Sequence, residues 1–450
     1  MNNTPNQLSR REFLRLLAIT GGATALSACA PALVNTAEPT KPSTSLAGPV
    51  TLTMWTHDKY YVDFFNTRAQ EWKANYPDIQ FTFDFQQVGD VFVKVLANMA
   101  AGEVVPDLLG FEQSWFPNFM KDDIIAQKFV DLTPRIGDER KKFVEGTWGK
   151  YIHKGKIYGV ESALCASVLY YQPEVLEKHN FQIPATWEEL METGPALGEK
   201  GVAFSLADAE SDFVFTVLFQ QRGGQYFHED GTFALTDDAN RQAFRDVCAL
   251  YRDGIDKKYL FAVNGADFWG PTTFTAFSEG KVASIAMPDW YSGTLKGNAA
   301  DMTGKWEVAP MPLWKDSNLR TGTWGGTGFG ISNESKYADL AWDLLHYSYM
   351  TQENQVKRFL EINYYPNMYD AINDPRVKEL NDPYYNGDSL GQSLAQVAAD
   401  TPVWYQSPVR RDMIEALGVV LPLFAMGDMD ADQMIDEIAK KVDEAFKALG

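Results

Sequence analysis

Two alternating apolar segments enclose a helical pattern near residue 50, and this arrangement most constrains the fold. Residues 50–54 and 79–85 each alternate apolar with polar side chains, as half-buried strands do. Between them, apolar side chains recur at helical spacing from Tyr61 to Tyr76, and Pro77 follows. A strand, a helix and a strand in this order form a βαβ unit, so we expect an α/β fold with a parallel sheet and a right-handed crossover.

The start of the chain carries export signals in a fixed order. Arg10 and Arg11 form a twin-arginine pair, and an apolar run follows from Leu16 to Leu26. The run is shorter than the ~20 apolar residues that span a bilayer. We therefore interpret residues 1–28 as a twin-arginine signal peptide. The alternative is an ordinary amphipathic helix with a buried Cys29.

The signal region closes with Leu-Ser-Ala-Cys, which resembles the lipobox of bacterial lipoproteins. This resemblance implies that Cys29 is lipidated and begins the mature chain. Residues 29–48 are rich in Pro, Ser, Thr and Ala and lack hydrophobic periodicity, so we expect a flexible tether. The folded part is then expected to work on the extracytoplasmic face of the cell membrane, in a periplasm or at the cell surface, attached only by its lipid.

Composition and charge limit the partners. The chain has a formal net charge of -20, and the leader's three arginines and one glutamate contribute +2, which leaves -22 for the mature part. This acidity argues against nucleic acid or an anionic membrane surface as a partner, although it also serves solubility. With 45% apolar residues, the chain can build sizeable cores. We expect a monomer.

The motifs of zinc proteases and nucleotide-binding proteins are missing from the sequence. The five histidines do not form HExxH, and GxxxxGK and GxGxxG are absent. Cys165 and Cys248 lie in apolar surroundings without CxxC spacing, which predicts small buried side chains. No pair of acidic residues stands out as a glycosidase acid and base. The sequence therefore predicts neither an enzyme nor a cofactor or metal site.

Further elements follow from periodicity and from helix-ending residues. We expect a helix from Asp90 to Ala101, two short strands around Lys154–Lys156, and one long strand from Ile157 to Tyr171 that crosses between domains. A capping box of Thr186 and Glu189 starts another helix. The other expected elements are strands from about 106, at 282–287 and near 306–310, and helices at 212–221, 238–253 (closed by Gly254), 272–279 and within 336–362, 408–426 and 430–449.

Candidate binding residues follow the predicted strands or lie in loops. Ligands of parallel sheets gather at the carboxyl ends of strands, which favours His57 and Asp58 after the first strand. A second set, after the third strand, is Glu112, Gln113 and Trp115. Trp115, Trp290, Trp324 and Trp404 lie near Gly, Pro or acidic residues outside any periodic face, where a flat ring could cover the apolar face of a sugar. Core packing is the alternative for each ring.

Several segments resemble extracellular solute-binding proteins of family 1, the sugar-binding subunits of ABC importers. The resemblance covers about residues 50–449. The segments that carry it are LTMW, PDLL after AGE, GKIYGV, VLYYQPEVLEKHNFQIPATWEEL, FSEGKVASIAMPDW, WEVAPMP, GGTGFGIS and YYPNM. It implies a two-lobed periplasmic-binding-protein fold, type II-like, with discontinuous lobes around a ligand cleft. Lobe 1 would comprise residues 49–163 and 327–370, and lobe 2 residues 164–326 and 371–450.

The resemblance also implies site residues. Val160–Leu164 is similar to the hinge stretch of maltose-binding proteins, which makes Glu161 a ligand candidate, and Trp290 is carried over as a stacking ring. Trp404 and Arg410 fall where such proteins often place an aromatic and a polar contact. The complete set of ligand candidates is Trp55, His57, Asp58, Glu112, Gln113, Trp115, Glu161, Asp289, Trp290, Trp324, Gly325, Gly326, Tyr365, Trp404 and Arg410.

The resulting functional hypothesis is capture of a sugar or oligosaccharide by lobe closure and its delivery to ABC permease subunits. One alternative is another solute, such as a polyol or a sugar acid, because Arg410 and Arg411 suit a carboxylate. The others are a surface-anchored carbohydrate-active enzyme and a structural lipoprotein without a ligand.

Overall fold

The computed structural model describes residues 48–449 of the chain. The predicted signal peptide, the predicted lipidation site Cys29 and the predicted tether up to residue 47 lie outside the described residues. Within the described range, no helix has both the length and the apolar composition that a membrane span requires.

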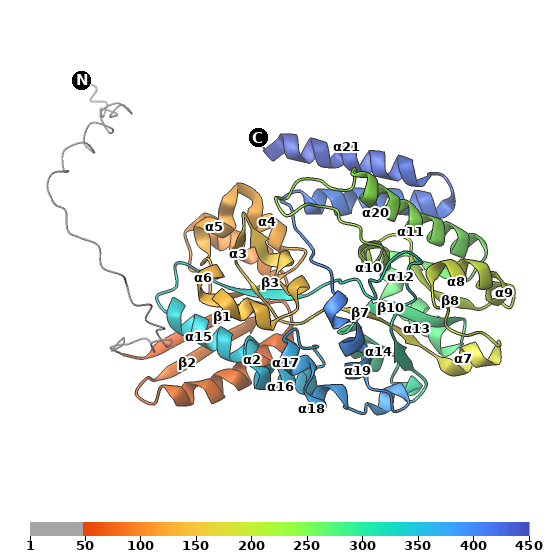
Figure 1. The fold of residues 1–450 in the computed structure, drawn as a ribbon. Coiled ribbons are helices and arrows are strands. Elements are labelled where there is room, and N and C mark those ends of the chain that lie inside the picture. The colour runs from red at the N-terminus through yellow and green to blue at the C-terminus, as the bar shows by residue number, and fades with distance from the viewer. Residues whose placement is uncertain (1–47, 450) are drawn as a thin grey trace, which may run out of the picture. The chain divides into compact units, whose positions relative to one another are not determined.

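A five-stranded mixed sheet forms the core of the first lobe and confirms the predicted βαβ unit. The strand order is β2-β1-β3-β12-β6. Strand β1 pairs in parallel with β2 and β3, whereas β12 runs antiparallel to β3 and β6. Strand β12 therefore returns from much later in the chain to lie beside β3 (Figure 1). The strands are β1 (Val50–Thr56), β2 (Phe81–Gln87), β3 (Leu108–Glu112), β6 (Val160–Glu161) and β12 (Thr327–Ile331).

Helix α2 (Lys59–Trp72) joins β1 to β2 and covers this sheet. Asp58 caps it by accepting a hydrogen bond from the backbone N–H of Tyr60 at 2.8 Å. Phe65 and Trp72 are buried on its inner face, and the Phe65 ring lies 4.8 Å from that of Phe329 on β12. Burial of each such side chain stabilises the fold by about 1.5–3 kcal/mol. The Asp58 cap and the buried face of α2 together fix the position of the loop that follows β1.

A second five-stranded sheet forms the core of the other lobe. Its order is β11-β7-β10-β8-β9, with β8 parallel to both β9 and β10, and β7 antiparallel to β10 and β11. Strands β4 (Ile152–His153) and β5 (Lys156–Ile157) make the predicted separate hairpin. The strands of the second sheet are β7 (Ser167–Tyr171), β8 (Ala203–Asp208), β9 (Leu260–Val263), β10 (Val282–Pro288) and β11 (Glu307–Ala309).

The remaining helices confirm most of the predicted ones. Gly102 ends α3 in a left-handed conformation, and Thr186 caps α8 by accepting from the Glu189 N–H at 3.1 Å. Helices α20 and α21 pack side by side (Figure 1). The bounds are α3 (Val91–Ala101), α4 (Phe116–Met120), α5 (Ile124–Lys128), α6 (Thr133–Ile136), α7 (Pro173–Lys178), α8 (Trp187–Thr193), α9 (Pro195–Gly198), α10 (Phe213–Gln221), α11 (Asp238–Asp256), α12 (Gly265–Phe268), α13 (Pro271–Ser278), α14 (Tyr291–Asn298), α15 (Ala338–Tyr349), α16 (Gln352–Ile362), α17 (Tyr369–Ile372), α18 (Pro375–Lys378), α19 (Leu390–Val397), α20 (Arg410–Met426) and α21 (Ala431–Leu449).

The predicted crossing within Ile157–Tyr171 is confirmed, but the prediction of one continuous strand there is wrong. Strand β5 ends at Ile157, β6 belongs to the first sheet, and β7 begins at Ser167 in the second sheet. Between them, Cys165 adopts a φ of 58°, which a β-strand does not accommodate. The break is hidden in the sequence because the residues on both sides are buried and apolar. The chain passes from the first sheet to the second at this point.

The predicted end of α11 at Gly254 is also wrong, since the helix continues to Asp256. A Cβ on Gly254 would lie 2.4 Å from Cγ of Leu260, so this glycine allows close packing and does not end the helix. Cys165 and Cys248 are both buried free thiols, which confirms the prediction of small buried side chains.

Candidate functional site

A hollow of about 490 Å³ lies where β1, β3 and β10 end. It brings together seven of the predicted site residues from both lobes. These are His57, Asp58, Glu112, Trp290, Trp324, Gly325 and Gly326. We call this the first hollow. Its position at the carboxyl ends of strands agrees with the rule for ligand sites in α/β sheets.

The first-lobe wall of this hollow is polar. Asp58 accepts a hydrogen bond from the hydroxyl of Tyr364, which also lines the hollow. Burial lowers the pKa of His57, and the Asp58 carboxylate opposes this shift. Glu112 accepts from the backbone N–H of Ser114 at 2.9 Å, and burial raises its pKa. The wall therefore offers a neutral imidazole and carboxyl oxygens, which suit hydroxyl groups.

The opposite wall is aromatic. The Trp290 and Trp324 rings lie 6.0 Å apart between centroids at an angle of 52°. Nε1 of Trp290 donates to the carbonyl oxygen of Trp324 at 3.0 Å. The Trp324 ring also meets Phe213 edge to face at 4.5 Å. These contacts hold both partly buried indoles in fixed orientations while they line the hollow.

Gly325 and Gly326 form the floor beside these rings, with φ values of 81° and 106°. Residues other than glycine rarely adopt such backbone angles. A Cβ on Gly326 would also lie 2.6 Å from Oε2 of Glu161. Both the backbone conformation and the packing therefore require glycine at position 326.

A second hollow, of about 460 Å³, shares Trp324 with the first. It contains the predicted residues Gln113, Trp115 and Arg410. The ring of Trp115 meets that of His57 edge to face at 5.1 Å, so it stands next to the first hollow. The shared Trp324 makes the two hollows neighbouring parts of one cleft.

Three polar side chains that line the second hollow, Gln113, Asp212 and Arg410, are buried. One guanidinium N–H of Arg410 donates to Oε1 of Gln113 at 3.3 Å. Nε of Arg410 and Nε2 of Gln113 are buried and have no partner among the described residues. Asp212 also lines this hollow, and burial raises its pKa while Arg410 acts in the opposite direction. The hollow therefore presents donors and an acceptor to the same space.

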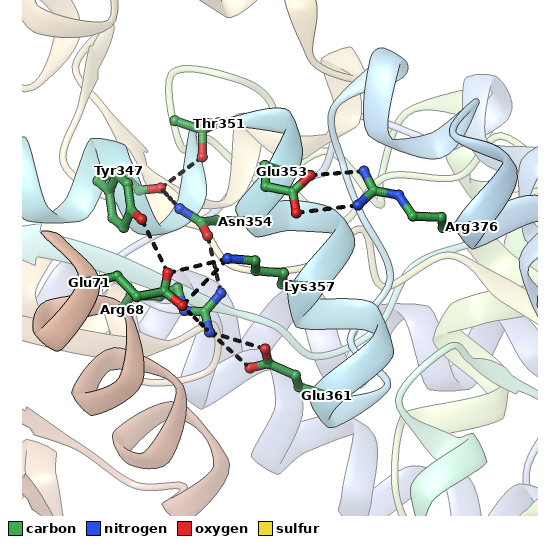
Figure 2. Close-up of polar contacts among 9 residues, drawn as sticks. All are labelled: Arg68, Glu71, Tyr347, Thr351, Glu353, Asn354, Lys357, Glu361 and Arg376. Carbon is green, nitrogen blue, oxygen red and sulfur yellow. Dashed lines mark hydrogen bonds and ion pairs between the residues drawn. The ribbon is translucent and has the colours of Figure 1, made fainter.

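Helix α16 supports the rim of the first hollow through a charged network (Figure 2). Arg68 on α2, with a side chain only 2% exposed, donates to Glu361 at 3.0 Å and to Asn354 at 3.1 Å. Glu361 lines the hollow, as does Asn363, the left-handed residue that ends α16. The network fixes the point from which the chain continues to Tyr364.

Five predicted site residues line neither hollow. Trp55 packs against the cluster around α3, with Nζ of Lys94 3.8 Å from its ring centroid. Trp404 is 2% exposed and packs on Tyr226, with ring centroids 5.3 Å apart. The structure therefore places these two rings in packed surroundings and not in the cleft.

Glu161, Asp289 and Tyr365 are fully buried beneath the cleft. Oδ2 of Asp289 accepts from the Tyr365 N–H at 2.8 Å, and burial raises the pKa of Asp289 to about 7. The hydroxyl of Tyr365 donates to the Gly391 carbonyl at 2.8 Å. Asp289 and Tyr365 therefore hold chain segments together, whereas their sequence neighbours Trp290 and Tyr364 line the cleft.

Sequence reasoning missed several residues of the cleft. Tyr364 is adjacent to the predicted Tyr365, and only the backbone direction decides which ring faces the hollow. Asp212 precedes α10 and would have been found by treating loops before helices as candidates. Lys150, buried below Gly325, carries no local signal. Other residues that line the first hollow without having been predicted are Tyr60, Tyr61, Ala163, Cys165, Gly293, Thr294, Thr327, Glu361, Ile362 and Asn363.

Within residues 48–449, no cluster of three or more His, Cys, Asp or Glu side chains could hold a metal ion. The cleft chemistry is instead that of aromatic faces with hydrogen-bonding groups around them. Such a combination recognises an uncharged polar molecule with apolar faces.

Comparison with curated proteins finds relatives that bind sugars. The chain is 27% identical over 363 residues to the arabinooligosaccharide-binding protein of Bacillus subtilis, covering 79% of this chain and 82% of that protein. It is 23% identical over 409 residues to the lactose-binding protein of Rhizobium radiobacter, covering 89% of this chain and 92% of that protein.

Solved structures share the two-lobed fold. The sugar-binding protein MalE of Xanthomonas citri superposes with a TM-score of 0.73 at 17% identity, over 88% of this chain and 97% of that one. A cyclo/maltodextrin-binding protein complexed with maltotetraose gives 0.69 at 21% identity, over 89% and 98%. The model of the bacterial extracellular solute-binding protein family matches residues 58–355. The chain belongs to the bacterial extracellular solute-binding protein family.

Proposed function

We propose that this protein captures an oligosaccharide in the cleft formed by the two hollows and delivers it to the permease subunits of an ABC importer. The observation that carries the proposal is the pair Trp290 and Trp324, fixed by their own contacts beside carboxyl and imidazole groups. An indole that covers about 60 Å² of a sugar's apolar face contributes about 1.5 kcal/mol. The names of the relatives agree with this ligand class.

An uncharged sugar fits the first hollow better than a sugar acid. Its lining includes Asp58, Glu112 and Glu361, and no lysine or arginine. A carboxylate in this hollow would meet like charges without a compensating cation. Arg410 belongs to the second hollow, where Asp212 faces the same space. The sugar-acid alternative is therefore less well supported than a neutral saccharide.

The binding experiment is a calorimetric titration of residues 30–450, which omit Cys29. The probes are arabinotriose, lactose and maltotriose, with galacturonic acid as the charged comparison. We expect one saccharide to bind with one site per chain and galacturonic acid not to bind. Binding of none of the neutral saccharides, or their hydrolysis, would contradict the proposal.

We propose further that the lobes, with the limits 49–163 and 327–370 against 164–326 and 371–450, close on the bound sugar. Closure requires that the sugar bind the closed form more tightly than the open one. Small-angle scattering should then give a smaller radius of gyration with saturating saccharide. Superimposable curves would count against closure.

The export route and the lipid anchor are also proposals, supported by the order of signals in residues 1–29. Replacing Cys29 with Ala should abolish incorporation of labelled palmitate. Replacing Arg10 and Arg11 with Lys should block export, because the twin-arginine route requires the pair. Equal palmitate labelling of the wild type and the Cys29 variant would refute the lipid anchor. Unchanged export of the Arg10 and Arg11 variant would refute the twin-arginine route.

A further inference from the structure

Lys150 is a buried cation below the floor of the cleft. It lies in a single 3-10 turn, Gly149–Tyr151, and is 1% exposed. Its Nζ donates to the carbonyl oxygen of Gly325 at 3.0 Å and to Oε2 of Glu161 at 3.2 Å. The turn is fixed in place because Gly149 packs so closely on Trp404 that a Cβ would lie 2.8 Å from the Trp404 carbonyl oxygen.

Glu161 has no free oxygen for a ligand in this arrangement. Its Oε1 accepts from the backbone N–H groups of Ser162 and Thr327, both at 3.0 Å. Its Oε2 pairs with Lys150, and the side chain is fully buried. The ion pair therefore ties together two segments that connect the sheets, the one after β6 and the one before β12.

The segment held by this pair carries the aromatic wall. Gly325 O binds Lys150, Gly326 O accepts from the Gln113 N–H at 3.0 Å, and Thr327 N–H binds Glu161. Trp324 precedes them, and its carbonyl oxygen holds Nε1 of Trp290. Movement of Gly325 would therefore displace both indole rings.

We propose that Lys150 is a positioning residue, which together with Glu161 fixes the segment from Trp324 to Thr327 and so orients both cleft tryptophans for the sugar. This inference rests on the proposed function. It assigns Glu161 a supporting role beneath the cleft, in place of the ligand contact that the family resemblance implies. A buried ion pair adds little net stability but can specify one arrangement of the chain, which is what a binding wall requires.

The electrostatics of the pair are consistent with this role. Burial alone would lower the pKa of Lys150, but the attraction and hydrogen bond of Glu161, together with the nearby Cys165 and Asp289, outweigh burial and raise the pKa above its ordinary value. Lys150 therefore remains charged at neutral pH. Removing one partner leaves the other charge buried without compensation, so single and double variants must be compared.

Hydrogen–deuterium exchange tests, without any saccharide, whether the Lys150–Glu161 pair fixes the segment from Trp324 to Thr327. In the wild-type protein, peptides that contain the amides of Ser162 and Thr327 should be among the slowest to exchange. Lys150→Met should speed their exchange by about tenfold or more. Arg222→Met is the control, because it breaks a partly buried ion pair between Arg222, which caps the C-terminus of α10, and Asp246 on α11, outside both hollows. Fast exchange in the wild-type protein, or unchanged exchange in Lys150→Met, would overturn the inference.

Calorimetry with arabinotriose, or with whichever of the three saccharides the wild-type protein binds, supplies the second readout. Lys150→Met should weaken binding by about tenfold or more, and Arg222→Met by less than about twofold. If Lys150→Met does not fold, the same titration is made with the double variant Lys150→Met/Glu161→Gln. This variant removes both charges and keeps an oxygen for the N–H groups of Ser162 and Thr327. Wild-type affinity in a folded variant would refute the inference. If the wild-type protein binds no saccharide, the proposed function fails, and exchange alone decides the role of Lys150.

Discussion

Replacement of Asp289 by Asn should make the protein's stability less dependent on pH. Asp289 is fully buried, its Oδ2 accepts from the Tyr365 N–H, and its Oδ1 has no partner among the described residues. Burial raises the pKa of this carboxyl from 3.8 to about 7. Between these values the folded protein holds a proton that the unfolded chain has released, so stability falls as the pH rises through this window.

The size of the effect follows from the pKa difference. A shift of about three units corresponds to about 4 kcal/mol lost between pH 4 and pH 8. For about 400 folded residues, this loss lowers Tm by about 5 °C. Asn cannot titrate and retains an oxygen for the Tyr365 N–H, so Asp289→Asn should not show this loss.

Differential scanning calorimetry at pH 4 and pH 8 measures this loss of stability as a change in Tm. The quantity to compare is Tm of the wild type minus Tm of Asp289→Asn, because the other carboxyls cancel in that difference. It should fall by about 5 °C from pH 4 to pH 8. Asp230→Asn is the control, since hydrogen bonds from Thr232 lower the pKa of Asp230. Its pH-dependent contribution therefore lies below about pH 4, and the corresponding difference in Tm should stay nearly constant from pH 4 to pH 8. A difference that stays constant with pH would refute the assignment of a buried, protonated Asp289.

Two further substitutions separate binding from folding. Trp324→Ala should weaken saccharide binding about five- to thirtyfold, from about 1–2 kcal/mol of lost stacking. It should also cost about 2 kcal/mol of unfolding free energy, because the ring packs on Phe213. Trp342→Ala, on α15 outside both hollows, is the control that should leave affinity unchanged in calorimetry; equal affinity losses would contradict the site. Gly326→Ala should destabilise the fold by about 2–3 kcal/mol, as urea unfolding would measure, whereas Gly297→Ala on α14, where a Cβ meets nothing within 4 Å, should not.

Much of the fold follows from the sequence because its signals are local. Alternation marks β1 and β2, Gly102 ends α3, and the Thr186 cap starts α8. The predicted residues that the structure places in the cleft, such as His57 and Glu112, lie at the carboxyl ends of strands. Their position needs only the rule that ligands gather at the carboxyl ends of strands.

The remaining features depend on contacts between residues distant in sequence. Trp324 and Trp404 both lie in loops, but only Trp324 has free space beside its ring, since Tyr226 covers Trp404. Glu161 has the sequence context of a ligand contact, yet Lys150 and the distant Thr327 occupy its oxygens. The direction of one backbone turn decides that Tyr364 faces the hollow while Tyr365 points into the core.

A crystal structure of residues 30–450 with a bound saccharide tests the central claim most directly. We predict one sugar ring against Trp290 and Trp324, with its hydroxyls near Asp58, Glu112 or His57 and an intact glycosidic bond. A saccharide bound away from these tryptophans, or cleaved within the cleft, would contradict the account.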